Sequence, residues 1–303
     1  MARRYCIAIL WILLSVGLID VQGAIGLSES SKSTIARKKQ SSVKVMRPPR
    51  NLVLRSASAL VKDQKTGEFL VQKQTDAVLP IASITKLMTA MVVLDARIDL
   101  NESITIEPSD IDTILYSPSR LPVGTSLSRE NALLLTLMAS ENRAAHALGR
   151  TYPGGLEAFV VAMNDKARAL GLSKTHFEDT AGLSSGNTSS ARDLARMVDA
   201  AYHYNLVREF TTREEATIQS GRRTLEFHNT NRLIQNPRWQ IGLSKTGFTN
   251  EAGRCLVMQA SVAQRSLLIV LLDSQGKLSR IGDANRIRQW MEGQSLARQK
   301  RQG

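Results

Sequence analysis

Strand patterns at both ends of the folded part of the chain, with helical patterns between them, limit the folds open to this sequence. Near the N-terminal end, residues 56–61 and 68–73 predict two strands joined by a turn at 63–67. Apolar residues at helical spacing follow at 83–96, 128–139, 143–150, 155–170 and 190–205.

Strand patterns return in the last part of the chain. A hairpin is predicted at 216–219 and 224–228, and three strands and an amphipathic helix at 240–246, 254–261, 266–273 and 279–291. The order predicts an α+β domain over 51–292, with an antiparallel sheet built from both chain ends and an inserted helical lobe. A polar, basic tail is predicted at 293–303.

The N-terminal residues indicate the compartment. Arg3 and Arg4 precede an apolar run to Ile19, which predicts a signal peptide over 1–23, cleaved between Gly23 and Ala24. An uncleaved membrane anchor is the alternative interpretation. Residues 24–50 form a predicted disordered basic arm, either a spacer or an electrostatic contact with an anionic wall or membrane surface.

Several binding classes find little support in the sequence. The formal net charge is +13, but the basic residues concentrate in the arm and tail without interleaved aromatic residues, so no nucleic-acid partner is predicted. The four histidines show no metal-ligand spacing, so neither a metal nor another cofactor is predicted. Cys6 lies in the predicted signal peptide and leaves Cys255 alone, which excludes an internal disulfide.

The stretch ASITKLMTA, residues 82–90, contains a lysine where a charge is costly. The residues around Lys86 are apolar nearly all round, which predicts a buried helix that starts after Pro80. Burial disfavours the ammonium form and lowers the pKa of a lysine. Ser83 lies three residues earlier, on the same helix face. A serine beside a neutral lysine base is an arrangement for nucleophilic catalysis.

Three short motifs occur in more than one copy, and the residues around each copy indicate which one could form a catalytic site. Ser-x-x-Lys occurs at 41–44, 83–86 and 274–277, Ser-x-Asn at 140–142 and 185–187, and Lys-Thr-Gly at 65–67 and 245–247. Among the first set, only Ser83 begins an apolar helix pattern. Lys65 lies in a predicted turn, whereas Lys245 ends an alternating stretch that predicts an edge strand, which can bind a peptide.

The two Ser-x-Asn copies are harder to separate. Ser140 and Asn142 lie at a predicted break between helices, where side chains can point into a cleft. Ser185 and Asn187 lie in the loop AGLSSGNTSS, where loop formation and a helix cap would explain them equally well. The residues alone leave both copies open.

With these motifs in order, the chain resembles the penicillin-binding D-alanyl-D-alanine carboxypeptidase/endopeptidase family of serine peptidases, over about residues 54–292. The stretches that carry the resemblance are LPIASITKLMTAMVVLDA, SRLPVGTSLSRENALLLTLMASENRAAHALGRTYPGG, DTAGLSSGNTSSARDLARM and LSKTGFTNEAGRCLVMQAS. Penicillin-binding proteins and class A β-lactamases combine Ser-x-x-Lys, a Ser-x-Asn-type motif and Lys-Thr-Gly. The resemblance favours the 140–142 copy and implies a β-lactamase/transpeptidase-like fold.

The resemblance also implies catalytic roles. Ser83 would be the acylated nucleophile, Lys86 its general base, and Ser140 a proton relay to the leaving amine. Asn142 would hold the substrate peptide or Lys86.

Residues 245–248 would serve binding, again by resemblance. Lys245 would keep a positive charge that depresses the pKa of Lys86, and with Thr246 it would meet the carboxylate side of the substrate. Gly247 would let the substrate backbone come close. The backbone N–H groups of Phe248 and Ser83 would form the oxyanion hole.

The implied function is a periplasmic peptidoglycan DD-endopeptidase that cleaves D-alanyl cross-links between stem peptides, with β-lactams as covalent inhibitors. The first alternative is a DD-carboxypeptidase that removes the terminal D-alanine of pentapeptide stems. An alternative of another class is a catalytically silent peptidoglycan-binding protein.

Two departures from related patterns bear on this choice. No second C-terminal β domain or amphipathic anchor is predicted, which favours the endopeptidase. Class A β-lactamases need a Glu-x-x-x-Asn loop, but after Glu178 the asparagine position holds Gly182. We therefore expect poor β-lactam hydrolysis and a long-lived acyl-enzyme.

Overall fold

The computed structural model describes residues 52–302, with side chains described as far as residue 297. The predicted signal peptide (1–23) and basic arm (24–50) lie outside the described residues. Within residues 52–302, no helix combines the length and the apolar character that crossing a bilayer requires.

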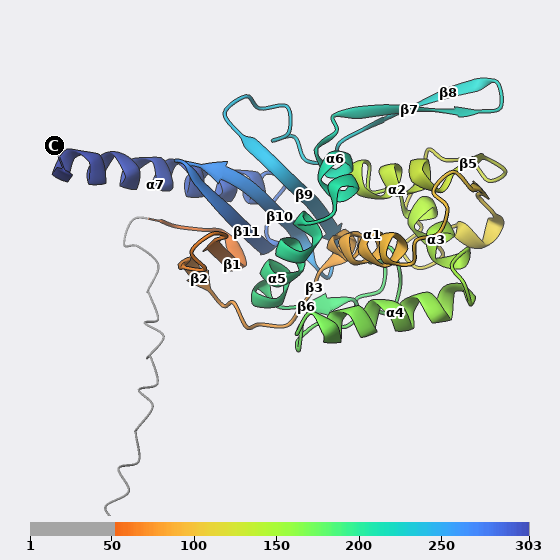
Figure 1. Ribbon diagram of the computed structural model, residues 1–303, viewed down its shortest axis with the longest axis horizontal. Coiled ribbons are helices and arrows are strands. Elements are labelled where there is room, and N and C mark those ends of the chain that lie inside the picture. Colours follow the sequence, from red (N-terminus) through yellow and green to blue (C-terminus); the bar gives the residue numbers. More distant parts are fainter. Residues whose placement is uncertain (1–51, 303) are drawn as a thin grey trace, which may run out of the picture. The chain divides into compact units, whose positions relative to one another are not determined.

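Five strands form one antiparallel sheet in the order β2-β1-β11-β10-β9 (Figure 1). They are β1 (Ser56–Asp63), β2 (Phe69–Lys73), β9 (Gln240–Thr249), β10 (Gly253–Val262) and β11 (Arg265–Ser274). β1 pairs with β11, so that Ser56 lies opposite Ser274. Both ends of the folded region therefore build the sheet, which confirms the predicted α+β architecture, and β9 is an edge strand as expected.

The strand β11 is apolar on both faces because helices cover both faces of the sheet. Its residues alternate between two cores, with Leu268, Val270 and Leu272 in the larger core and Leu267, Ile269 and Leu271 in the smaller one. The larger core lies on the side of α5 (Ala191–Tyr202), and α7 (Ser279–Gln302) covers the smaller one. Removal of apolar surface from water on both sides makes β11 the centre of the fold.

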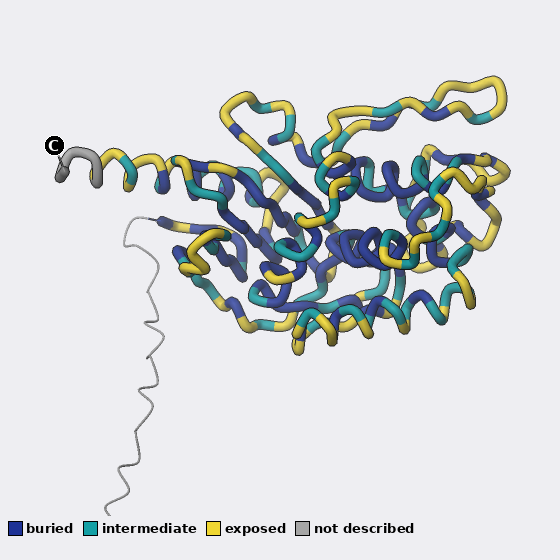
Figure 2. Tube along the Cα trace, in the orientation of Figure 1, coloured by how far each residue is buried: buried dark blue, intermediate teal, exposed yellow. Residues whose placement is uncertain are grey.

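The helical lobe lies between β2 and β9 in the chain. Its helices are α1 (Lys86–Asp95), α2 (Arg129–Met138), α3 (Asn142–Arg150), α4 (Gly155–Ala169), α5 and α6 (Asn205–Thr212). α1 contacts α2 to α6, and residues Lys86 to Val93 are all buried, as Figure 2 shows. The predicted burial of the helix that follows Ser83 is confirmed.

The structure differs from the predicted elements at their ends. The predicted helix 83–96 begins as a 3₁₀ turn, η1 (Ala82–Thr85). The helix expected to end near 291 continues to Gln302, because several residues after Met291, such as Glu292, Gln294 and Ala297, are good helix formers although they show no apolar period. The short helix α6 was not predicted; the burial of Val207 and Phe210 stabilises it more than its own propensity does.

Short strand pairs complete the lobe. They are β3 (Leu79–Pro80) with β6 (Thr188–Ser189), β4 (Ser103–Thr105) with β5 (Ser126–Ser128), and the predicted hairpin β7 (Glu215–Ser220) with β8 (Arg223–His228). A second 3₁₀ turn, η2, spans Pro108–Asp110. The first two pairs are too short to show alternation in the sequence, and sequence reasoning missed them.

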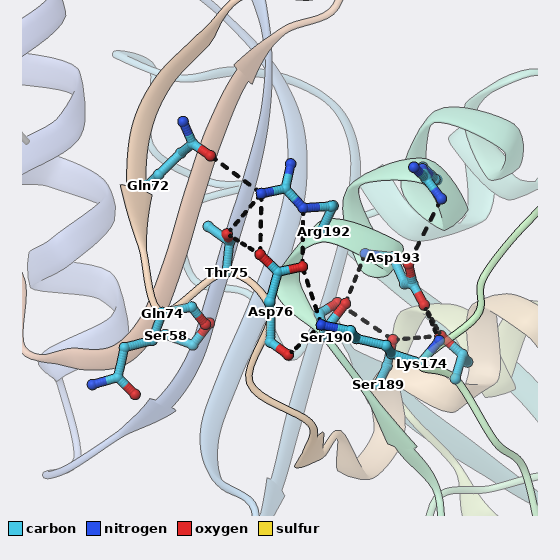
Figure 3. Close-up of polar contacts among 12 residues, drawn as sticks. Ser58, Gln72, Gln74, Thr75, Asp76, Lys174, Ser189, Ser190, Arg192 and Asp193 are labelled. Atoms are coloured by element: carbon cyan, nitrogen blue, oxygen red, sulfur yellow. Dashed lines mark hydrogen bonds and ion pairs between the residues drawn. The ribbon is translucent and has the colours of Figure 1, made fainter. Parts of the chain in front are cut away.

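A polar network ties the segment after β2 to the start of α5 (Figure 3). The carboxylate of Asp76 accepts from Arg192 Nε at 3.1 Å and Nη2 at 3.2 Å, and from Lys174 Nζ at 3.2 Å. Hydrogen bonds from Arg192 are the largest cause that lowers the pKa of Asp76, to about 2. The guanidinium of Arg192 also lies 5.1 Å from the ring centroid of Phe69. The network therefore joins the sheet to the helical lobe near the start of the segment that leads to Ser83.

Candidate active site

The turn that carries Ser83 is fixed by its neighbours before α1 begins. Ala82 has a φ of +47°, in the left-handed region that is unfavourable for a residue with a side chain. The N–H of Ile81 donates to the Asn187 carbonyl at 3.0 Å. Ile81 and Ile84 are fully buried, while Ser83 is half-buried. Buried neighbours and a strained backbone thus hold the Ser83 hydroxyl in one place.

Lys86, the first residue of α1, is 0% exposed and has three polar neighbours. Its Nζ lies 2.8 Å from Ser83 Oγ, 2.7 Å from Asn142 Oδ1 and 2.6 Å from the Ala181 carbonyl oxygen. The last two oxygens can only accept hydrogen bonds. A neutral amine has two N–H groups for these acceptors, which leaves its lone pair for the Ser83 hydroxyl. The arrangement can therefore aim a base at the nucleophile.

The surroundings of Lys86 favour this neutral form. Burial lowers the pKa of Lys86 to about 7, while the negative charges of Asp179, Glu141 and Asp112 act in the opposite direction. An amine with this pKa is substantially unprotonated at neutral pH, which suits a general base.

Ser140 lies in the break between α2 and α3. Its φ is +60°, and Asn142 is the first residue of α3. Asn142 reaches Lys86, while the Ser140 hydroxyl accepts a hydrogen bond from Lys245 Nζ at 2.8 Å. Between them, Glu141 is buried and accepts from the Ser119 hydroxyl, and burial raises its pKa. The predicted break therefore brings Ser140 and Asn142 to the two buried lysines, Lys245 and Lys86.

Lys245, in β9, is the second buried amine of the site. It is 1% exposed, and burial is the largest cause that lowers its pKa, with repulsion from Lys86 and Arg280 acting in the same direction. The sequence interpretation expected Lys245 to depress the pKa of Lys86. Burial is the cause that lowers the pKa of Lys86, and the charges that act on it are those of three carboxylates, so the expected effect of Lys245 stays a prediction.

β9 lies against the Ser83 turn because Gly247 has no side chain. A Cβ at Gly247 would lie 2.8 Å from the Ile81 carbonyl oxygen and 3.2 Å from the Ser83 amide nitrogen. Gly247 thus lets β9 pack closely against the turn, and the expected approach of substrate backbone to Gly247 stays a prediction. Thr246 donates to the Thr230 hydroxyl at 2.7 Å, and Phe248 is half exposed. The amides of Ser83 and Phe248 belong to these two adjoining segments.

The other described copies of the three motifs lie in turns, at strand ends or in loops. Residues 65–67 form the turn between β1 and β2, where the Asp63 carboxylate accepts the N–H groups of Lys65 and Thr66. Ser274 is buried at the end of β11, and its hydroxyl lies 2.7 Å from that of Ser56. The copy at 41–44 lies outside the described residues. Asn187 is fully buried within a loop.

Sequence reasoning missed three groups near the site. They are the Ala181 carbonyl, the Thr230 hydroxyl and Arg280, whose Nη1 donates to the carbonyls of Gly247 (2.7 Å) and Cys255 (3.0 Å). A backbone carbonyl leaves no trace in a sequence. The two side chains lie outside the motifs, and only the packing of α7 and the 230 loop brings them to β9.

Metal and thiol chemistry have no candidate site in the part of the chain that the structure describes. No three His, Cys, Asp or Glu side chains between residues 52 and 302 are grouped to hold a metal ion. Cys255 is buried, and burial raises its pKa to about 11, so the thiol stays protonated.

Comparisons with known proteins agree on one family. The peptidase S11 family, described as D-alanyl-D-alanine carboxypeptidase, matches residues 42–276. The chain is 49% identical to a D-alanyl-D-alanine endopeptidase of Pseudomonas aeruginosa, over 79% of this chain and 78% of that protein. It is 45% identical to a D-alanyl-D-alanine endopeptidase of Escherichia coli, over 78% and 77% of the two chains.

Among solved structures, the crystal structure of the Streptomyces K15 DD-transpeptidase is similar, with a TM-score of 0.74 and 26% identity. The match covers 82% of this chain and all of that one. The arrangement of sheet and helical lobe is thus shared beyond the closer sequence relatives.

Proposed function

Because this chain belongs to the peptidase S11 family of D-alanyl-D-alanine carboxypeptidases, we propose that it is a serine-type peptidase that cleaves D-alanyl cross-links in peptidoglycan. The observation that carries the proposal is the buried amine of Lys86, 2.8 Å from the half-buried hydroxyl of Ser83. The names of the relatives at 49% and 45% identity support an endopeptidase.

Acylation would begin with attack of Ser83 Oγ on the carbonyl carbon of a D-alanyl residue, while the hydroxyl proton passes to Lys86. The N–H groups of Ser83 and Phe248 would stabilise the oxyanion. The carbon–nitrogen bond then breaks, and the proton that Lys86 accepted passes through the Ser140 hydroxyl, which Lys245 orients, to the leaving amine, so that Lys86 is neutral again. The product of this half-reaction is an ester between Ser83 and the stem peptide.

Hydrolysis of this ester would complete the cycle. A water molecule attacks the ester carbonyl and gives a proton to Lys86. The carbon–oxygen bond breaks, the proton returns to Ser83 Oγ, and a stem peptide with a free D-alanine carboxylate leaves. No cofactor is needed for either step.

β-Lactams would acylate the same serine. Gly182 bears on how long that acyl-enzyme lasts: a Cβ at this position would lie 2.0 Å from the Ala82 carbonyl oxygen. An asparagine side chain therefore has no room where class A β-lactamases need one. This supports the expectation of slow β-lactam hydrolysis.

The compartment follows from the substrate. Peptidoglycan lies outside the cytoplasm, in agreement with a signal peptide over 1–23 and a periplasmic location. The basic arm, residues 24–50, would add electrostatic attraction to an anionic wall or membrane surface, which salt screens beyond ~10 Å at 0.1 M.

The DD-carboxypeptidase remains the alternative, since more distant relatives carry that name, such as one of Bacillus subtilis at 31% identity. Both reactions share the acyl donor and differ in the leaving amine, which is free D-alanine or the side-chain amine of a diamino acid on another stem. Contacts with the larger leaving group along β9 could lower the barrier for the cross-link alone.

The test compares kcat/KM of residues 24–303 on a purified cross-linked muropeptide dimer and on a monomeric pentapeptide, with products identified by mass. We expect monomers from the dimer to form faster than free D-alanine from the pentapeptide. The reverse order would establish the carboxypeptidase. No product from either substrate would favour a silent binding protein; Ser83→Ala is the inactive control, and Ser126→Ala, an exposed serine on β5, should retain full activity.

A further inference from the structure

The loop over 178–187 contains the second Ser-x-Asn copy and lies beside the Ser83 turn. Asn187 is 0% exposed, and both ends of its amide are used inside the loop. Its Oδ1 accepts from the N–H of Glu178 at 2.7 Å, and its Nδ2 donates to Asp179 Oδ2 at 2.7 Å. Asn187 therefore fixes the orientation of the Asp179 carboxylate.

That carboxylate in turn determines the path of the backbone. Four successive N–H groups donate to Asp179: those of Ala181 (2.6 Å), Gly182 (2.6 Å), Leu183 (3.0 Å) and Ser184 (2.7 Å). Hydrogen bonds from several N–H groups to one ionised carboxylate are strong, so the turn has little freedom. The carbonyl of Ala181 is left to accept from Lys86 Nζ at 2.6 Å.

Two further bonds attach the loop to the catalytic segment. Thr89, in α1, donates from its hydroxyl to the Thr180 carbonyl at 2.6 Å. The N–H of Ile81, two residues before Ser83, donates to the Asn187 carbonyl at 3.0 Å. The loop is thus bonded to the residues on either side of the nucleophile and its base.

We propose that Asp179 and Asn187 are positioning residues for acyl transfer, which act by holding the Ala181 carbonyl against the amine of Lys86. The inference rests on the proposed function and extends it to a loop outside the three motifs. With Ala181 and Asn142 each occupying one N–H of the neutral amine, the lone pair has one remaining direction, toward Ser83 Oγ. If the Ala181 carbonyl moves, the amine can turn away from the serine.

Asp179 also acts through its charge. Four charged or titratable groups interact with Lys86. Asp179, Glu141 and Asp112 raise its pKa, and the charge of Lys86 in turn lowers the pKa of Lys245. Among the carboxylates, Asp179 has the largest effect in raising the pKa of Lys86. Loss of its charge should lower that pKa and so move the acid limb of the acylation rate to lower pH. A role in loop stability alone would leave this limb in place.

The experiment measures the acylation rate of residues 24–303 by a chromogenic β-lactam as a function of pH, with near-ultraviolet circular dichroism as the test of folding. Asp179→Asn should move the acid limb to lower pH and reduce the limiting rate on the order of 10- to 100-fold, since a misplacement of about 1 Å can have such an effect. Asp179→Ala should show the same shift and a larger loss, because no acceptor remains for the four N–H groups. Asn187→Ala should reduce the limiting rate.

A second variant keeps the proposal open to refutation if the Asp179 variants do not fold. Thr89→Val is isosteric and removes one bond to the loop, so it should slow acylation without moving the acid limb. The matched control is Thr136→Val, because the Thr136 hydroxyl is buried without a hydrogen-bond partner among the described residues. It should acylate at the wild-type rate.

The possible results distinguish a failure of the proposed function from a failure of the inference about Asp179 and Asn187. Wild-type protein that is not acylated would overturn the proposed function and this inference with it. Normal acylation of the wild type, with unchanged rate and acid limb in folded Asp179→Asn, or with Thr89→Val equal to Thr136→Val, would overturn the inference alone.

Discussion

Replacement of Gly182 by alanine should disable the site through a single methyl group. Gly182 has a φ of +80°, and a Cβ there would lie 2.0 Å from the Ala82 carbonyl oxygen, 2.3 Å from its carbon and 2.9 Å from the Ser83 nitrogen. All three are backbone atoms, so no side chain can rotate away. Because real Cβ contacts essentially never fall under 3.0 Å, the Ser83 turn or the loop must move by about 1 Å.

The two expected effects differ in size. The left-handed backbone is unfavourable for alanine by about 1–2 kcal/mol, and overpacking adds about 1–3 kcal/mol to the destabilisation. A displacement of about 1 Å between a nucleophile and its partners can reduce the rate about 100-fold. Gly182→Ala should therefore remain folded at moderate temperature but acylate far more slowly than the wild type.

Gly155 offers a matched control for the backbone strain. Its φ is +78°, and a Cβ there would meet no atom within 4 Å. Gly155→Ala should lose about 1–2 kcal/mol of stability and keep the wild-type acylation rate. The assay combines urea unfolding with stopped-flow acylation by a chromogenic β-lactam. A folded Gly182→Ala protein that acylates like Gly155→Ala would refute the reasoning.

Further predictions concern labelling, pH dependence, stability and the basic arm. Fluorescent penicillin should label Ser83 alone, and Ser83→Ala and Lys86→Ala should abolish labelling with an unchanged circular dichroism spectrum; an adduct mapped to another serine would contradict this. Burial lowers the pKa of Lys86 from its ordinary value of 10.5 to about 7 in the folded state. The unfolded chain therefore binds this proton more tightly, which lowers the free energy of unfolding. The loss is complete below about pH 7 and absent above pH 10.5. Lys86→Met should thus resist urea better than the wild type in acid, by a margin that vanishes in alkali. The pKa of Asp76 is about 2 instead of 3.8, so its stabilising effect is present above the higher value and lost as the pH falls to the lower. Because that side chain is half exposed, Asp76→Asn should lower the free energy of unfolding at neutral pH by less than about 1 kcal/mol, measured by urea titration. Deletion of residues 24–50 should weaken sedimentation with intact sacculi in low salt only, without changing the turnover of soluble muropeptides; equal sedimentation would make the arm a spacer.

The sequence predicts the parts of this fold that depend on long periodic segments. The largely apolar runs in 254–261 and 266–273 and the apolar run after Ser83 correspond to β10, β11 and α1 because each buries most of its residues. α6 and the two- and three-residue strands carry too few residues for a period. Their stability comes from tertiary contacts, which a local pattern does not contain.

In the candidate site, too, the sequence predicts one part, the side chains of the motifs, and misses another, the backbone groups around them. The side chains of Ser83, Lys86, Ser140, Asn142 and Lys245 are predicted from motifs and lie within hydrogen-bond reach of one another in pairs. The structure adds backbone groups, and a backbone carbonyl such as that of Ala181 has the same sequence signature as any other.

The pairing of β1 with β11 determines when the candidate site can form during folding. Ser56 lies opposite Ser274, so the first strand has no partner on that side until almost the whole domain is present in the compartment where it folds. Contacts between such distant segments make folding slow, and an unpaired apolar strand is prone to associate with other chains. β9, which brings Lys245 to Ser140 and lies against the Ser83 turn, is also made late. A chain without its last strands therefore holds Ser83 and Lys86 but lacks the strand that carries Lys245, so the candidate site stays incomplete until the sheet closes.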